Sequence, residues 1–286
     1  MTHPALVPGQ VAVVIGGAAG IGRAAAEGFA KRGLHVCIAD RDMERLAEAE
    51  AAVRAAGADH DADVMTHAVD VADVQQVITL ESVVRSRFGG TDVLMNNAGV
   101  QPGSHIFGPA ENWRQVIGIN LWGAIHGTQT FVPKMLERSG PGLVINTGSK
   151  QGITTPPGDP AYNTAKAGLK AFTEALAHEL RNTDGCELTA HLLIPGFVFT
   201  QLTRPGETEK PESAWTPEQT ADFMFDRLDA GDFYILCPDN DVPRWLDEKR
   251  MQWAIGDIVE NRPPLSRWHP DYADAFKAFV NDGAKG

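Results

Sequence analysis

Short apolar runs rich in β-branched residues alternate along the chain with longer segments in which apolar residues recur every three or four positions. The short runs have the length and composition of buried strands, and the longer segments have the periodicity of amphipathic helices. The predicted helices lie at residues 23–32, 42–56, 73–88, 111–138 and 160–181. The predicted strands are Val11 to Ile15, Leu34 to Ala39, Thr66 to Asp70, Asp92 to Asn96, Leu143 to Thr147, Leu188 to Ile194 and Phe233 to Leu236.

This alternation is typical of repeated βαβ units, whose strands pair in parallel. We therefore predict an α/β fold with a doubly wound, seven-stranded parallel sheet and helices on both faces. No Ser/Gly-rich linker interrupts residues 1–238, which predicts one domain.

Two segments depart from the pattern. Residues 201–219 are polar and contain three prolines, which is typical of a mobile loop, and we expect a lid at about residues 200–215. Residues 239–286 predict a helical C-terminal extension, with two helices around the corner Pro263-Pro264. We expect this extension to pack on the domain or on a neighbouring subunit.

The net charge of −12 opposes binding to nucleic acid or an anionic membrane through a basic surface. The three cysteines, Cys37, Cys186 and Cys237, lack CxxC spacing, which favours buried thiols in a reducing compartment over a disulfide framework. No apolar run reaches the roughly 18 residues of a membrane span, and the first ten residues lack a signal-peptide pattern. No histidine pair or Cys/His/Asp cluster has metal-ligand spacing. We expect a cytoplasmic protein without a catalytic metal.

The stretch "VAVVIGGAAGIG" places Gly16, Gly20 and Gly22, with Ile21 between the last two, directly after the first strand and before a helix. Glycine permits a sharp turn and a close approach of the backbone to a pyrophosphate, and the helix N-terminus offers free N–H groups. The spacing alone is a weak signal in a chain with 29 glycines. Its position between a strand and a helix predicts a dinucleotide site.

Asp40 closes the second predicted strand, 18 residues after Gly22. A carboxylate at this place hydrogen-bonds the adenosine ribose and repels a 2'-phosphate, which favours NAD over NADP. Arg41 beside it leaves NADP possible, because a guanidinium binds phosphate well. The alternative interpretation makes Asp40 a solvated strand end or the N-cap of the helix that begins at Met43.

The stretch "AYNTAK" sets Tyr162 and Lys166 four residues apart. Asp159 as N-cap and Pro160 at the first helical position would start a helix here, so both side chains lie on one helix face. An ordinary tyrosine is a poor base at pH 7, with a pKa of about 10. A neighbouring ammonium and a positively charged nicotinamide ring would lower it. Ser149 follows the fifth strand and can reach the same edge of the sheet, where its hydroxyl would bind a substrate oxygen.

The chain resembles the short-chain dehydrogenase/reductase family over about residues 10–238. Its glycine motif matches T-G-x-x-x-G-x-G, except that Ile15 stands where the family has threonine. The motifs "DVAD" at 70–73, "NNAG" at 96–99 and "PGFVFT" at 195–200 follow in the family's order. The resemblance implies a Rossmann-like fold, a nicotinamide dinucleotide and a homodimer or homotetramer. It further implies cofactor contacts from Asp70, Val71, Asn97, Ala98, Gly99, Tyr162, Lys166, Pro195, Gly196, Val198 and Thr200.

The resemblance also implies four catalytic roles. Tyr162 is the acid or base, Lys166 is its electrostatic partner and a ribose ligand, and Ser149 orients the substrate. Asn120, in "GINLWG", interrupts a helix and holds a water that connects the lysine to solvent. Lys150 is either a solvated charge or a group that faces the substrate.

The expected partner is a small alcohol or carbonyl compound. Aromatic and aliphatic residues in the loops favour a hydrophobic or aromatic secondary alcohol; these are Phe107, Ile153, Phe197, Phe199 and Trp215. The leading hypothesis is an NAD-dependent oxidoreductase. The alternatives are an NADPH-dependent carbonyl reductase and a sensor or scaffold that binds dinucleotide without turnover.

Overall fold

The predicted strands form one sheet in the computed structural model, which describes residues 2–282. All pairings are parallel, and the strand order is β3-β2-β1-β4-β5-β6-β7. The prediction of a doubly wound parallel sheet is therefore confirmed, although β3 begins two residues before its predicted start. The strands are β1 Val11–Ile15, β2 His35–Asp40, β3 Val64–Ala68, β4 Val93–Asn96, β5 Gly142–Thr147, β6 Leu188–Ile194 and β7 Tyr234–Leu236.

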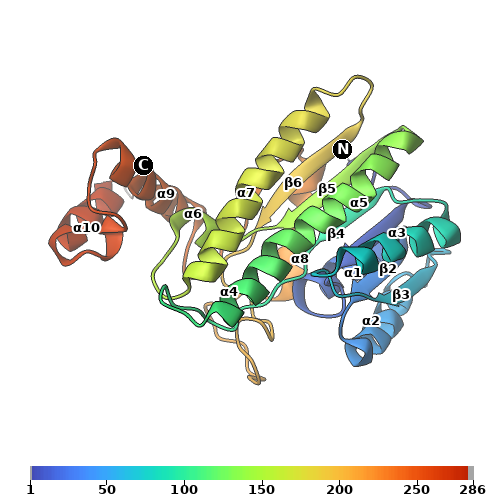
Figure 1. Ribbon diagram of the computed structural model, residues 1–286, viewed down its shortest axis with the longest axis horizontal. Coiled ribbons are helices and arrows are strands. Elements are labelled where there is room, and N and C mark those ends of the chain that lie inside the picture. The colour runs from blue at the N-terminus through green and yellow to red at the C-terminus, as the bar shows by residue number, and fades with distance from the viewer. Residues whose placement is uncertain (1, 283–286) are drawn as a thin grey trace.

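Helices cover both faces of this sheet. Apolar side chains of α1, α2 and α8 pack on one face, and those of α3, α5 and α7 pack on the other. Figure 1 shows the second group lying across the near face. The helices are α1 Gly20–Lys31, α2 Met43–Ala56, α3 Val74–Phe88, α4 Ala110–Ile117, α5 Gly123–Arg138, α6 Gln151–Thr154, α7 Pro160–Arg181, α8 Pro217–Asp229, α9 Arg244–Val259 and α10 Ala273–Asp282.

Two parts of the helix prediction need correction. The single helix predicted at 111–138 is divided into α4 and α5 by a π-helical turn at Gly118–Trp122. The polar loop predicted to reach residue 219 ends earlier, because α8 begins at Pro217. Thr216 and Gln219 form a reciprocal capping box there, with proline at the first helical position. This start signal was visible in the sequence but was assigned to the loop.

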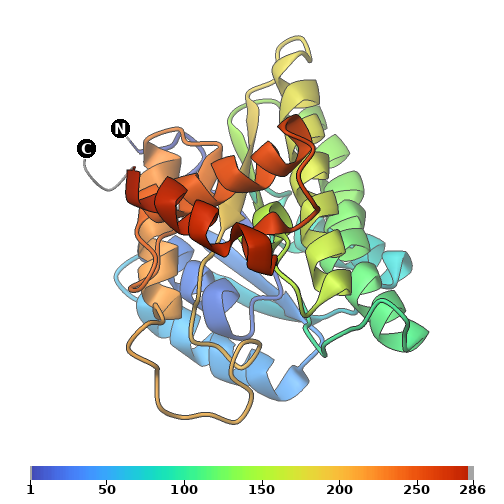
Figure 2. The same cartoon turned by 90° about the vertical axis from the view of Figure 1, so that its left-hand side faces the viewer.

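The C-terminal extension contains the two expected helices, α9 and α10, on either side of Pro263-Pro264. They lie to one side of the sheet, with α9 beside α6, and Figure 2 faces this side. Trp253 is buried between them against Phe276 and Phe279, with ring centroids 5.4 and 5.3 Å away. The last four residues of the predicted extension, 283–286, lie outside the described residues.

The three cysteines have the packing expected of small apolar residues. Cys37 and Cys237 are completely buried, and Cys186 is partly buried. Burial raises the pKa of both buried thiols to about 12, so both remain protonated near neutral pH. No helix within residues 2–282 is both long and apolar enough to cross a membrane.

Two histidines at the amino end of β6 share one threonine hydroxyl. The Ala5 N–H donates to His3 Nδ1 (3.2 Å), so the ring proton of neutral His3 lies on Nε2, which donates to Thr189 Oγ1 (3.1 Å). Thr189 donates in turn to His191 Nε2 (3.0 Å), whose Nδ1–H donates to the Asp232 carbonyl (2.8 Å). When both rings are neutral, each proton of this chain has an acceptor; the Gly142 carbonyl lies 3.4 Å from the same Thr189 hydroxyl as a second acceptor.

Acid should therefore destabilise the protein through this network. Burial is the main cause that lowers the pKa of both His3 and His191. In the unfolded chain both histidines become protonated near the ordinary pKa of about 6.5, whereas in the folded protein they become protonated only at a lower pH. The stability that the two neutral rings contribute is therefore complete above about pH 6.5 and is lost as the pH falls below it. We expect the free energy of unfolding to decrease between pH 7.5 and 5. Chemical denaturation should show a smaller decrease in His191→Asn.

His60→Asn is the matched control, because His60 is exposed in the turn that follows α2. It should retain the pH dependence of the wild type. The assignment to the histidine network is wrong if His191→Asn also retains it in full.

Candidate active site

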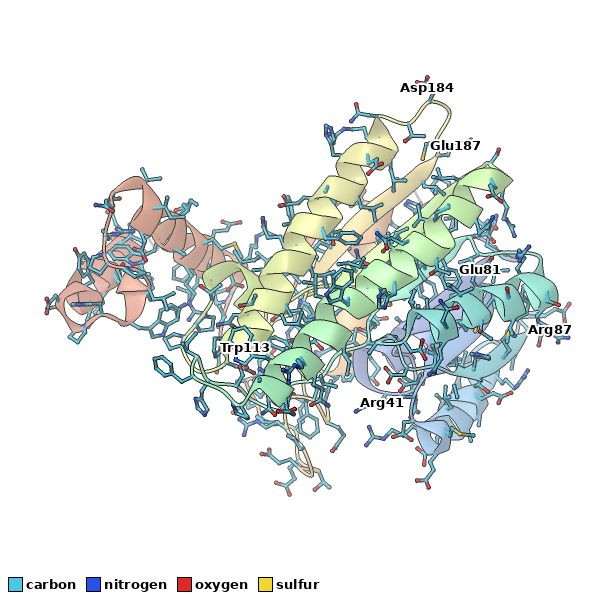
Figure 3. The ribbon with its side chains drawn as sticks, viewed as in Figure 1. Arg41, Glu81, Arg87, Trp113, Asp184 and Glu187 are labelled. Atoms are coloured by element: carbon cyan, nitrogen blue, oxygen red, sulfur yellow. The ribbon has the colours of Figure 1, made fainter. Side chains whose placement is uncertain are left out.

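The carboxyl ends of the strands meet at one edge of the sheet, beside a cavity of about 960 Å³. In Figure 3 this edge faces down, with Arg41 after β2 and Trp113 on α4 nearby. Asp184 and Glu187, between α7 and β6, mark the opposite edge at the top. The strand order reverses between β1 and β4, and ligands of doubly wound proteins bind at such a reversal.

Tight packing explains the glycines of the turn between β1 and α1. Gly16 has φ +79°, and a Cβ added to it would lie 2.4 Å from the Ala98 nitrogen. A Cβ on Gly22 would lie 2.1 Å from the Gly16 oxygen. The same oxygen accepts a hydrogen bond from Asn97 Nδ2 (2.8 Å), which ties this turn to the end of β4. A side chain at either glycine would displace the backbone that lines the cavity.

Asp40 lies at the end of β2 and faces the glycine turn. Its carboxylate accepts hydrogen bonds from the backbone N–H groups of Ala18 (3.1 Å) and Asp42 (3.2 Å). The N-cap of α2 is Asp42, which accepts from the Arg45 N–H (3.1 Å), so the alternative role of Asp40 as N-cap is wrong. Arg41 and Arg45 line the same part of the cavity and place positive charge beside Asp40.

Tyr162, Lys166 and Ser149 all line this cavity. Tyr162 and Lys166 come from the first two turns of α7, and their side chains are buried, with 7% and 4% of each residue exposed. Lys166 Nζ donates to the Thr147 carbonyl at the end of β5 (2.7 Å) and lies 5.7 Å from the centroid of the Tyr162 ring. Ser149 follows β5 and accepts a hydrogen bond from the Gln151 N–H (3.2 Å).

Burial dominates the ionisation of the tyrosine and the lysine. It raises the pKa of Tyr162 to about 12, with the Ser149 hydroxyl acting in the opposite direction. It lowers the pKa of Lys166 to about 8. Within the polypeptide itself, burial thus outweighs the effect of the Ser149 hydroxyl on the phenol. The predicted lowering of the tyrosine pKa depends on the positive charge of a nicotinamide ring and stays a prediction.

Asn120 lies in the π-helical turn between α4 and α5, as the resemblance implied. Its amide exchanges two hydrogen bonds with the backbone of Val100, accepting from the N–H (2.8 Å) and donating to the carbonyl (2.9 Å). Asn120 is almost completely buried and holds the chain that leaves β4. Its role as the anchor of a water remains a prediction.

The N-terminus of α7 is capped differently from the prediction. Asp159 is the residue before the helix, but its side chain makes no capping hydrogen bond. The Asp159 carboxylate accepts a hydrogen bond from Ser104 Oγ (2.5 Å). Ser104 Oγ in turn accepts a hydrogen bond from the Ala161 N–H (2.9 Å). A serine of the loop after β4 therefore satisfies the first turn of the helix that carries Tyr162.

The predicted lid is a loop whose two ends are joined. Val198 pairs with Trp215 in an isolated parallel bridge. The Trp215 N–H donates to the Phe197 carbonyl and the Phe199 N–H donates to the Trp215 carbonyl, both at 2.9 Å. The loop contributes several side chains to the cavity: Thr200, Gln201, Leu202, Thr203 and Pro205.

The cavity unites nearly all of the predicted site. Among the predicted catalytic and cofactor-binding residues, only Gly22 and Asn120 do not line it. The remaining predicted residues do: Gly16, Gly20, Ile21, Asp40, Arg41, Asp70, Val71, Asn97, Ala98, Gly99, Ser149, Tyr162, Lys166, Pro195, Gly196, Val198 and Thr200. The lining residues that were not predicted include Arg45 on α2, Gln115 on α4 and Asp239 after β7. Asp239 could have been found from the sequence, because it closely follows the end of the seventh predicted strand, where ligand contacts are expected.

The predicted apolar wall is wrong in most of its members. Phe197 lines the cavity, whereas Phe107 is fully exposed. Ile153 packs with the apolar residues under α9, and Trp215 packs against the core beside α8. Phe199 is also outside the lining. Sequence position could not distinguish these outcomes, because an apolar loop residue can pack, as Trp215 and Ile153 do, or be exposed, as Phe107 is.

The family model described as short chain dehydrogenase matches residues 10–211. The chain belongs to the short-chain dehydrogenase family. An uncharacterized oxidoreductase of Thermotoga maritima is 38% identical to it over 196 residues, 68% of this chain and 73% of the relative. A D-beta-hydroxybutyrate dehydrogenase of Cupriavidus necator is 29% identical over 242 residues, 82% of this chain and 88% of the relative.

A solved structure also resembles this short-chain dehydrogenase. The crystal structure of a short chain dehydrogenase/reductase from Burkholderia phymatum in complex with NAD gives a TM-score of 0.79 at 31% identity. The match covers 90% of this chain and 96% of the other. This coverage is larger than that of the family model, so the likeness includes residues beyond 211.

The buried charge of Lys166 should destabilise this short-chain dehydrogenase. Burial lowers the pKa of Lys166 from 10.5 to about 8, so the free energy of unfolding is reduced by the full cost of the buried charge below pH 8. This cost disappears above pH 10.5, where the lysine is neutral in both the folded and the unfolded protein. We expect Lys166→Met to raise the free energy of unfolding at pH 7 by about 1–3 kcal/mol in chemical denaturation.

Lys170→Met is the control, one turn further along α7. Lys170 is about one-third exposed and pairs with Glu174 (2.7 Å), so its removal should leave stability unchanged or slightly lower. If Lys166→Met is as stable as the wild type or less stable at pH 7, the ammonium is adequately compensated in the folded protein.

Proposed function

We propose that this protein transfers a hydride between NAD and a secondary alcohol or ketone, with Tyr162 as the acid–base group. The observation that carries the proposal is the shared cavity, which the glycine turn, Tyr162, Lys166 and Ser149 all line. A cofactor lying along the glycine turn would thus reach the group that handles the proton. The same arrangement argues against a sensor or scaffold without turnover.

The residues of the cavity fit a nicotinamide dinucleotide. Gly16 and Gly22 leave a cradle that a Cβ would fill, and the N-terminus of α1 begins at this turn, which suits a pyrophosphate. Asp40 would bind the adenosine ribose, and its charge supports NAD over NADP. Arg41 and Arg45 support the alternative, a reductase that uses NADPH. When bound, the cofactor accepts or supplies the hydride.

The protein's own groups would move the proton. The Tyr162 hydroxyl would exchange it with the substrate oxygen, and Ser149 would donate a hydrogen bond to the same oxygen and keep it in place. Lys166 is fixed by the Thr147 carbonyl and would stabilise the phenolate after it has lost its proton. Burial of both Tyr162 and Lys166 strengthens this electrostatic effect, since bulk water is excluded from it.

We further propose a substrate of mixed polarity. Phe197, Pro102 and Leu202 offer apolar surface, which supports the expected hydrophobic or aromatic alcohol. Three amide side chains beside them offer hydrogen bonds; these are Gln101, Gln151 and Gln201. A screen of secondary alcohols with NAD, followed by absorbance of the reduced cofactor, should therefore give its highest kcat/KM with an alcohol that has an apolar skeleton and a second polar group.

Replacement of the tyrosine tests the proposed chemistry. Tyr162→Phe removes the proton-carrying hydroxyl and should lower kcat by about 10³-fold, while the Kd for NADH, measured by fluorescence, changes little. Tyr234→Phe is the control, since Tyr234 lies on the edge strand and donates to Glu174 (2.5 Å) far from the cavity. The proposal fails if Tyr162→Phe retains more than about a tenth of the wild-type kcat.

Replacement of Asp40 tests the cofactor preference. Asp40→Asn keeps an oxygen for the Ala18 N–H and removes the charge, so the ratio of kcat/KM for NAD to that for NADP should fall by about tenfold or more. Asp73→Asn is the control, because Asp73 is the N-cap of α3 outside the cavity lining and asparagine preserves a good cap, so the ratio should change much less. A wild-type protein that prefers NADP would disprove the assignment to NAD.

A further inference from the structure

Lys150, the residue after Ser149, forms a largely buried ion-pair cluster with two carboxylates. Its Nζ lies 3.0 Å from Asp239 Oδ2 and 2.5 Å from Asp247 Oδ2. The three side chains are 15%, 7% and 4% exposed, respectively. Arg250 approaches Asp247 to 4.0 Å from the next turn of α9. Breaking such a cluster is costly, because a remaining charge would be left buried without its partner.

The cluster joins three separate segments of the chain. Lys150 belongs to the segment after β5, and its backbone N–H donates to the Pro195 carbonyl after β6 (3.3 Å). Asp239 follows β7, and its Oδ2 also accepts from the Phe197 N–H (3.4 Å). Asp247 belongs to the first turns of α9, in the C-terminal extension. Through Lys150, the Asp247 carboxylate therefore connects the extension to the segments after β5 and β7, which both border the cavity.

The cluster also packs directly against the cavity. A Cβ added to Gly196 would lie 2.4 Å from Asp239 Oδ2 and 2.8 Å from Lys150 Nζ. Lys150, Asp239 and Gly196 all line the cavity. The cluster therefore abuts the backbone at Gly196 that is expected to contact the cofactor, and Ser149 lies one residue away along the chain.

Apolar packing holds α9 in the position that the cluster requires. Met251 lies one turn after Asp247 on the same helix face and packs with Ile153 of α6, beside Leu192 and Leu236 of the sheet. The helical turn α6 begins two residues after Ser149. The first turns of α9 thus contact the segment that follows Ser149 in two ways, with the charged side chain of Asp247 and the apolar side chain of Met251.

We propose that Asp247 is a positioning residue of the active site, which holds Lys150 and through it keeps Ser149 in the orientation that the reaction requires. This inference rests on the proposed function for its catalytic consequence. The extension thereby serves the chemistry as well as packing on the domain. Asp247 acts through Lys150, so its effect should vanish when Lys150 cannot pair with it.

The test compares Asp247→Asn with Glu248→Gln in the full-length protein. Both replace a carboxylate of α9 by an amide, but Glu248 is exposed and pairs only with Arg244 among the described residues (2.7 Å). Hydrogen–deuterium exchange should become faster across residues 148–155 in Asp247→Asn and remain unchanged in Glu248→Gln. This measurement requires no substrate, so it decides the structural part of the inference even if no turnover is found.

Kinetics test the catalytic part. Asp247→Asn should lower kcat by about tenfold and leave the KM for NAD within about twofold of wild type, because the serine is displaced while the glycine turn is intact. In a Lys150→Met background, adding Asp247→Asn should change kcat by less than about twofold, as expected of coupled residues. A thermal unfolding midpoint above the assay temperature would confirm that each variant is folded in the assay.

Unchanged exchange at 148–155, or the same loss of kcat with and without Lys150, would overturn the inference. A wild-type protein that oxidises or reduces no alcohol or ketone with either cofactor would instead disprove the proposed function. Normal wild-type turnover with an unaffected Asp247→Asn would reject the positioning role alone.

Discussion

A lysine ammonium buried beneath the carboxyl edge of the sheet is the constraint around which the site is organised. Lys166 can be accommodated because the Thr147 carbonyl at the end of β5 accepts its hydrogen bond. This requires α7 to pass closely over β5, and a Cβ added to Gly152 would lie 2.6 Å from the Lys166 backbone, so α6 is also packed tightly against it. The position of the cation thus dictates the path of three neighbouring elements.

Local patterns in the sequence were sufficient for most of the fold. A parallel strand buried on both faces, such as β1, is a short continuous apolar run, and its bounds were predicted without error. The glycine turn and the pair Tyr162 and Lys166 were equally readable, because each depends on spacing within one or two elements. The parallel order of the strands then brought these distant motifs to the same edge.

Features that depend on distant contacts were not readable. Ser104 replaces Asp159 in satisfying the start of α7, across 57 residues of chain. Whether Lys150 would be solvated depended on Asp239 and Asp247, 89 and 97 residues later. Whether Trp215 would face a ligand or the core depended on Phe223 of α8, a helix that was not predicted. In each case the partner's location is set by tertiary packing.

The joined ends of the loop from Thr200 to Ala214 have a consequence for how this enzyme scaffold can diversify. Backbone hydrogen bonds between Trp215 and the segment Phe197–Phe199 hold both ends beside the cavity, and Thr203 Oγ1 donates to the Val198 carbonyl (2.6 Å) near the first end. Once both ends are anchored, the cost of closing a longer loop grows by only roughly 0.6 kcal/mol for each doubling of length. The residues after Thr203 can therefore vary in length and sequence while the sheet, Tyr162 and Lys166 keep their places.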